Sequence, residues 1–184
     1  EGSREEGGIV VGGGPANVRN NVAVGNGYGG ISVQNYGGRN LIQNVWITHN
    51  TLINNFDSGI NLQGWNSATN VLAYNAILPR MGTLAIRPAP SAGINIGNEV
   101  CIPASDLPTA QCFVSEVAPY DLWPNATSPL LNAAASGAEP WKPADDFMGT
   151  IRGNSPDVGA FERTSGTYFH LGGGGAPRPP RITV

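Results

Sequence analysis

The sequence offers few side chains that could perform catalysis, and they form no established catalytic pattern. Hydrolysis of a glycosidic bond needs two carboxylates at a suitable separation, whereas a lyase needs a base and a group that neutralises the uronate. The first 100 residues hold few carboxylates and no Asp-Asp or Asp-x-Asp pair. His49 and Asp57 are candidate bases, and Arg80 and Arg87 could neutralise an acidic sugar. Each also suits a corner, turn or surface role, so the sequence leaves open whether the chain is an enzyme.

A second set of side chains suits sugar binding better than catalysis. Gln34, Gln63 and Arg87 follow apolar strands at equivalent outward positions and would form a polar column. Trp46 and Trp65 would add aromatic faces, on which the CH faces of sugar rings stack while their hydroxyls bond to amides. The alternative is structural, because tryptophans can cover loops and stacked glutamines can stabilise a sheet. These five residues are the candidate carbohydrate-binding residues.

Two local features bear on the compartment and on modification of the chain. Cys101 and Cys112 lie 11 positions apart in a proline-rich loop and predict one local disulfide, with free thiols as the alternative. The triplet that begins at Asn125 is the only N-glycosylation sequon, although such triplets also occur by chance. The cysteine pair therefore favours an oxidising compartment.

The composition argues against several classes of partner. Charged residues make up 12% of the 184 residues, the formal net charge is −3, and no basic stripe suggests nucleic acid. No run of about 18 apolar residues occurs, so no membrane span is expected. A metal site is not expected, because only His49 and His170 could add imidazole. No cofactor is evident, and Ca²⁺ is possible but unsupported by any acidic cluster.

A repeating architecture must position these residues. A glycine followed by apolar, variable and apolar residues recurs in segments 8–11, 30–33, 59–62 and 93–96, and segment 82–86 is a degenerate copy. Repetition at this spacing predicts a solenoid rather than a sandwich. Alternate side chains of a strand face opposite sides, so the apolar residues should face inward and the variable ones outward. The expected inward residues are Ile31, Val33, Ile60, Leu62, Ile94 and Ile96, and the outward ones are Ser32, Asn61 and Asn95.

A second register lies between the glycine strands. Segments 18–21, 47–50 and 72–75 align on an apolar first residue and a final asparagine. Asparagine tolerates left-handed backbone and bonds to nearby backbone groups. The spacing favours a ladder of amides from Asn21, Asn50 and Asn75 at one corner over three separate loop residues.

The glycine strands and asparagine corners across residues 8–96 resemble right-handed parallel β-helix proteins of the pectin-lyase-like superfamily. Segments 122–133, 146–152 and 156–162 resemble the end motif of secreted bacterial and archaeal β-helix proteins. That motif reads L-x-P-x-S-P-x-I-D-x-G, then D-F-x-G-x-x-R, then D-I-G-A-Y-E, and Asn132 stands where the family usually has Asp. The resemblance implies an all-β chain, a right-handed parallel β-helix with a C-terminal cap, and an extracellular polysaccharide as partner.

The expected organisation has three parts. Residues 1–100 form the β-helix coils, residues 101–162 form the disulfide-bonded loop and the cap, and residues 163–184 form a Gly/Pro-rich tail or linker. The cap would cover the strand edges and apolar core of the last coil. Asp146 and Arg152 are expected to pair and support a turn within it. Because a repeat strand begins almost at once, upstream coils of the same protein or a stacking subunit are expected at the N-terminal end.

Two functions follow as hypotheses. The first is the C-terminal region of a secreted or surface-attached β-helix protein that binds or processes extracellular polysaccharide, as a lyase or glycoside hydrolase if it is an enzyme. The alternative is a non-enzymatic structural or adhesive surface protein that assembles end to end into filaments. Fold alone does not decide between them.

Overall fold

The computed structural model describes residues 7–101, 112–118, 120–135 and 139–164, and its regular structure is almost entirely β. Three parallel four-stranded sheets form the main body. Sheet A contains β1 (Ile9–Val11), β4 (Gly29–Val33), β7 (Ser58–Leu62) and β10 (Leu84–Arg87). Sheet B contains β2 (Ala16–Arg19), β5 (Val45–Thr48), β8 (Val71–Ala73) and β11 (Ile94–Ile96). Sheet C contains β3 (Val22–Val24), β6 (Thr51–Ile53), β9 (Ala76–Leu78) and β12 (Glu99–Val100).

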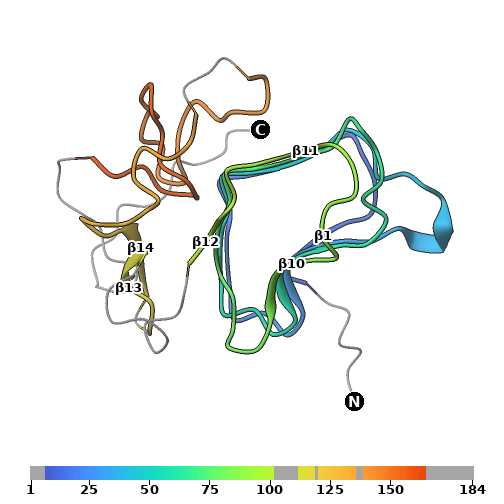
Figure 1. Ribbon diagram of the computed structural model, residues 1–184, viewed down its shortest axis with the longest axis horizontal. Helices are drawn as coiled ribbons and strands as arrows, with labels where there is room; N and C mark the ends of the chain where they lie inside the picture. Colours follow the sequence, from blue (N-terminus) through green and yellow to red (C-terminus); the bar gives the residue numbers. More distant parts are fainter. Residues whose placement is uncertain (1–6, 102–111, 119, 136–138, 165–184) are drawn as a thin grey trace, which may run out of the picture.

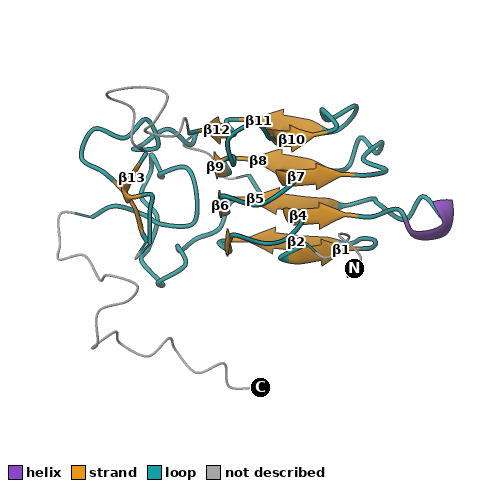
Figure 2. Ribbon diagram, turned by 90° about the horizontal axis from the view of Figure 1, so that it is seen from below, coloured by secondary structure: helices purple, strands orange, loops and turns teal. Residues whose placement is uncertain are grey.

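The chain visits sheets A, B and C in turn and then begins the next coil, so the strands stack as a parallel β-solenoid of about four coils (Figures 1 and 2). The predicted all-β solenoid is therefore confirmed. Its interior consists of apolar side chains stacked in register, such as Ile31 on Ile60 and Ile47 on Leu72. All four are fully buried. Stacking of like residues removes apolar surface from water in every coil, which is what stabilises such a repeat.

The corner between sheets B and C contains the predicted amide ladder. The Asn21 Nδ2 donates to Asn50 Oδ1 at 3.0 Å, and the Asn50 Nδ2 donates to Asn75 Oδ1 at 2.9 Å. The structure adds Asn98 as a fourth rung, which accepts from Asn75 Nδ2 at 2.7 Å. Each Oδ1 also accepts from the backbone N–H of the rung before it, so the ladder satisfies polar groups that the corner would otherwise bury unpaired.

The residue before each rung has left-handed backbone. These positions are occupied by Asn20, His49, Tyr74 and Gly97, with φ of 54°, 52°, 54° and 60°. The sharp corner requires this conformation, which favours asparagine and glycine over most residues. His49 and Tyr74 are therefore set at special backbone positions within one column.

One assignment of a repeat strand was wrong. Ile94 and Ile96 do not stack with the inward residues of sheet A, because β11 pairs with β8 in sheet B and β10 is the fourth strand of sheet A. Asn95 pairs with Leu72, so Asn95 takes the inward position, and Ile94 and Ile96 face outward with 45% of each exposed. Gly93 has a φ of +80° and lies against the Asn70 carbonyl, so it serves a different corner from the earlier glycines.

The C-terminal segment packs beside the solenoid. It contains the antiparallel pair β13 (Phe113–Ser115) and β14 (Asp121–Pro124), followed by loops and turns. Its apolar side chains cover the outward residues of sheet C. They include Phe113, Leu122, Leu130, Val158, Ala160 and Phe161, and they meet Ile53, Ala76 and Leu78 of the solenoid. We expected this segment to cover the last coil, but its contacts lie along the flank (Figure 2).

The predicted disulfide between Cys101 and Cys112 is present and joins the end of the last coil to this flanking segment. The expected pairing of Asp146 with Arg152 is replaced by two separate roles. Arg152 forms an ion pair with Glu162 at 3.2 Å, while Asp146 accepts from the backbone N–H groups of Met148 and Thr150. Both residues still support the turn. Asp146 bonds to the backbone within the turn, and Arg152 Nε donates to the carbonyl of Asp145 beside it.

Candidate functional site

The outer face of sheet A carries the candidate site. In β4 and β7 the inward side chains are apolar, so the alternate positions present polar groups outward. The residues after these strands, Gln34 and Gln63, lie next to each other, because Gln63 N–H donates to the carbonyl of Val33 at 3.1 Å. Gln34 and Gln63 are thus brought together as the sequence predicted.

A loop inserted after β4 closes one side of this surface. It contains the short 3₁₀ helix η1 (Tyr36–Gly38), which protrudes from the solenoid in Figure 1. Asn35 supports the loop, since its Oδ1 accepts from Asn40 N–H at 2.9 Å. The loop also needs glycines beneath it, because a Cβ at Gly12 would lie 3.1 Å from the Tyr36 ring, and one at Gly64 would lie 2.6 Å from Asn35.

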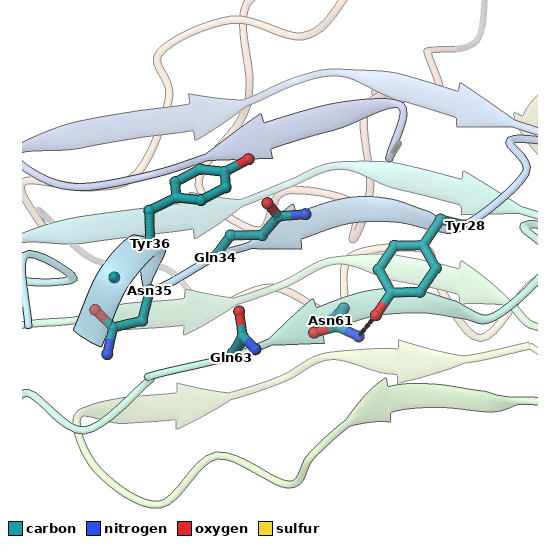
Figure 3. Close-up of a pocket in the computed structure, with 7 residues that line it drawn as sticks. Tyr28, Gln34, Asn35, Tyr36, Asn61 and Gln63 are labelled. Atoms are coloured by element: carbon teal, nitrogen blue, oxygen red, sulfur yellow. Dashed lines mark hydrogen bonds between the residues drawn. The ribbon is translucent and has the colours of Figure 1, made fainter. Parts of the chain in front are cut away.

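The result is a hollow of about 300 Å³ lined by amide and phenol groups. Its lining residues are Tyr28, Gln34, Asn35, Tyr36, Gly37, Asn61 and Gln63. Figure 3 shows the Gln34 amide between the two phenol rings and the amides of Asn61 and Gln63 below them in that view. The Asn61 Nδ2 donates to the Tyr28 hydroxyl at 2.9 Å and fixes that ring, whereas Tyr36 is 55% exposed. We call this hollow the sheet A pocket.

An ion pair borders the sheet A pocket. Arg87 on β10 pairs in register with Asn61 on β7, and its Nη1 lies 3.1 Å from Asp57 Oδ1. The other carboxylate oxygen, Asp57 Oδ2, lies 3.5 Å from Asn61 Nδ2. Two of the candidate catalytic residues, Asp57 and Arg87, are therefore brought together, and they bind each other. Arg87 aligns with Asn61 rather than with Gln63, so it lies beside the glutamines and not in their column.

The lining of the pocket combines amide groups with phenol rings. Amides offer donors and acceptors to hydroxyl groups, and phenol faces offer surfaces for sugar CH groups. Among the described residues, the lining provides no pair of carboxylates and no nucleophile activated by a neighbouring base.

The two candidate tryptophans lie elsewhere. Trp65 is 3% exposed, and its Nε1 donates to the carbonyl of Ala92 at 3.1 Å, so it has no free face for a sugar. Trp46 faces outward on sheet B, where it contributes to a shallow hollow of about 250 Å³. This hollow is lined by Pro15, Ala16, Asn17, Asn44 and Trp46.

The remaining candidates are also separate from the pocket. His49 is fully buried beneath the C-terminal segment, where burial lowers its pKa from 6.5 to about 3, with Arg152 and Lys142 adding to the effect. A substrate has no access to it in this structure. The Arg80 guanidinium lies 4.9 Å from the centroid of the Phe56 ring. Asn125 is half-buried after β14, and its Oδ1 accepts from Thr127 N–H at 2.9 Å.

The sequence reasoning missed five residues of the pocket: Tyr28, Asn35, Tyr36, Gly37 and Asn61. Asn61 was expected to face outward but was not connected with a binding site. The sequence does contain a signal for this loop. Gly8 and Gly30, which begin the strands of the first and second coils, are 22 positions apart, whereas Gly30 and Gly59 of the second and third coils are 29 apart. Such an extra length between repeats marks a protruding loop, where function often lies.

No cluster of three or more His, Cys, Asp and Glu side chains that could hold a metal ion occurs in the described ranges. In the same ranges, no helix is long and apolar enough to cross a bilayer. The expected tail of residues 163–184 lies, apart from its first two residues, outside the part of the chain that the structure describes.

Comparison with known proteins adds no identification: no family model, no curated protein and no solved structure matches the chain.

Proposed function

We propose that this chain is a carbohydrate-binding β-solenoid of a secreted or surface-attached protein, and that polysaccharide binds at the sheet A pocket. The observation that carries the proposal is the convergence of two phenol rings and four side-chain amides on one hollow of about 300 Å³. Sites for neutral polar ligands combine apolar faces with a few well-placed hydrogen-bonding groups, and this lining does so.

Binding without catalysis fits the surroundings of the pocket best. The carboxylate of Asp57 borders the pocket, and Arg87 and the Asn61 amide already engage it. A general base must reach the proton that it removes, and a glycosidase needs a second carboxylate across the bond. The described residues of the pocket offer neither arrangement.

The extracellular part of the proposal and its family each have further support. The disulfide between Cys101 and Cys112 is typical of proteins that mature in an oxidising compartment. The stacked coils, the asparagine ladder and the C-terminal motif also support membership of the right-handed, pectin-lyase-like β-helix class. Handedness and family remain part of this proposal.

A binding assay with paired variants tests the function. Tyr36→Ala removes the exposed phenol of the pocket, and Leu41→Ala is its control, because Leu41 is an exposed apolar residue of the same loop outside the pocket lining. Screening on a polysaccharide array and then calorimetry should show binding by the parent chain and by Leu41→Ala. Tyr36→Ala should bind about tenfold more weakly, the loss expected for one stacking aromatic. Equal affinity of the two variants would place the site elsewhere.

A second candidate function is assembly by stacking of coils. It is favoured by the last coil, where Val100 takes the inward position above Ile77 and is 45% exposed. An exposed core residue at the end of a solenoid invites a further coil from another chain. Sedimentation velocity across a hundredfold range of concentration tests this function, and a constant monomeric coefficient would exclude it.

A further inference from the structure

The charges around the sheet A pocket point to the class of glycan, on the premise that the pocket binds sugar as proposed. We infer that the pocket selects neutral glycans over uronate polymers, and that Asp57 sets this selectivity. All seven lining residues are uncharged. A neutral hydroxyl can both donate and accept, and the amides of Gln34, Asn61 and Gln63 can meet it in both ways.

On the Asn61 side of the pocket, a uronate carboxylate would find its cation already paired with Asp57. Removing a carboxylate from water is costly unless a cation or several donors replace the lost hydration. The cation beside Asn61 is Arg87, and its Nη1 lies 3.1 Å from Asp57 Oδ1. Arg39 lies in the protruding loop, where its Nε is 3.7 Å from the position that a Cβ on Gly37 would take. Because Asp57 belongs to the same chain and lies beside Arg87 in the fold, it competes at high effective concentration with any carboxylate of a ligand.

Asp57 also acts directly against acidic ligands. It lies immediately before β7, and its Oδ2 is 3.3 Å from Ser58 Oγ and 3.5 Å from Asn61 Nδ2. The carboxylate is thus placed between the arginine and an amide of the pocket. A uronate that approached Asn61 would meet a like charge, which disfavours the wrong ligand by repulsion. The ion pair therefore excludes acidic sugars in two ways.

The ion pair of Arg87 and Asp57 is accessible enough to solvent for a substitution to break it without unfolding the chain. The side chain of Arg87 is 51% exposed and that of Asp57 is 17% exposed. Because the arginine of the pair is half-exposed, the pair contributes only modestly to stability, and the nearly isosteric Asp57→Asn should leave the fold intact. It should also free a guanidinium at the edge of the pocket, and guanidinium is well suited to carboxylate recognition.

The test measures binding of hexasaccharides of both classes by calorimetry at low salt. The neutral probes are the hexamers of β-1,4-xylose, β-1,4-glucose and β-1,4-mannose, and the acidic probes are those of galacturonate and mannuronate. The parent chain should bind at least one neutral hexamer and should bind the uronates at least about tenfold more weakly. Its affinity for the neutral hexamer should change less than about twofold between low and high salt, because no charge pair forms.

Asp57→Asn should raise the affinity for uronates by about fivefold or more, in a salt-sensitive way, and leave neutral binding within about twofold. The double variant D57N/R87Q should lose that gain. Asp145→Asn is the control for net charge, since Asp145 is exposed on the flanking segment and its substitution should change neither class.

The outcomes separate the two proposals. If the parent chain binds uronates as well as neutral hexamers, or if Asp57→Asn gains no uronate affinity, the selectivity is refuted while the sugar-binding function stands. If no polysaccharide or hexamer binds, the function itself fails. Both binding measurements use the full chain. Arg87→Gln gives a second test, because it should not improve uronate binding and should leave neutral binding unchanged.

Discussion

Protonation of His49 should weaken the attachment of the C-terminal segment to the solenoid. The imidazole is fully buried, its ring centroid lies 5.3 Å from that of Tyr74, and neither of its nitrogens has a hydrogen-bond partner within the described residues. The charged groups that face it are Arg152 and Lys142, both cations of the overlying segment. A proton on His49 would therefore add a third positive charge in a buried place.

The magnitude follows from the pKa. Burial holds the pKa of His49 at about 3, whereas an unfolded chain has about 6.5. Between these values the unfolded state binds the proton more strongly, so stability is complete above pH 6.5 and falls as the pH decreases toward 3. The slope is about 1.4 kcal/mol per pH unit, which gives a loss of about 2 kcal/mol at pH 5 and about 5 kcal/mol at pH 3.

Other buried groups titrate nearby and must be separated from His49. Burial raises the pKa values of Asp157 and Glu162, so their protonated forms favour the folded state and their contribution falls as the pH rises. This effect has the opposite sign. It is common to the parent chain and to a variant at position 49, so the difference between the two isolates the histidine.

His49→Asn is the suitable variant, because Asn20 occupies the equivalent corner with φ of 54° and asparagine accepts this backbone. The assay is urea unfolding followed by tryptophan fluorescence from pH 5.0 to 7.5. The free energy of unfolding of the parent chain should fall by about 2 kcal/mol more than that of His49→Asn over this range. Parallel pH dependences of the two proteins would refute the reasoning.

Three further predictions concern the packing. Asn50→Leu removes a rung that bonds Asn21, Asn75 and two carbonyls, so it should cost about 3 kcal/mol or more of unfolding free energy, measured in urea. Gly159→Ala should cost about 2–3 kcal/mol and expose the C-terminal segment to limited proteolysis, because Gly159 has a φ of +96° and an added Cβ would lie 2.8 Å from Thr51 Oγ1. Reduction of the disulfide, which spans 11 positions, should lower stability by about 3 kcal/mol, seen as a lower Tm in reducing buffer.

The solenoid and its ladder could be predicted because their signals are local and repeated. The same local pattern of flanking residues surrounds Asn21, Asn50 and Asn75, and the three form one ladder. The disulfide likewise joins two residues that are close in sequence. The sheet assignment of Ile94 failed because a glycine can serve any corner of the coil. Its partner, Val71, is defined only by the path of the whole coil.

The site and the flanking segment depend on contacts that no local pattern records. Trp65 looked suitable for stacking, but its indole donates to Ala92, 27 positions away. Tyr36 enters the pocket only because the loop folds back over Gly12. The position of the C-terminal segment depends on outward apolar residues of sheet C, and in a sequence these look the same as residues that face a solenoid core.

The flanking segment changes how the repeats can come apart. It binds every coil: Asn20 of the first, Thr48 and Thr51 of the second, Tyr74 of the third, and Cys101 at the end of the fourth. A bare stack of repeats can fray from its ends one unit at a time, because each repeat contacts only its neighbours. Here a coil that unfolds must also break its contacts with the flanking segment, which the other coils bind as well. The solenoid should therefore unfold as a single cooperative unit. Under force applied along its axis, the coils should stay together until the flanking segment detaches.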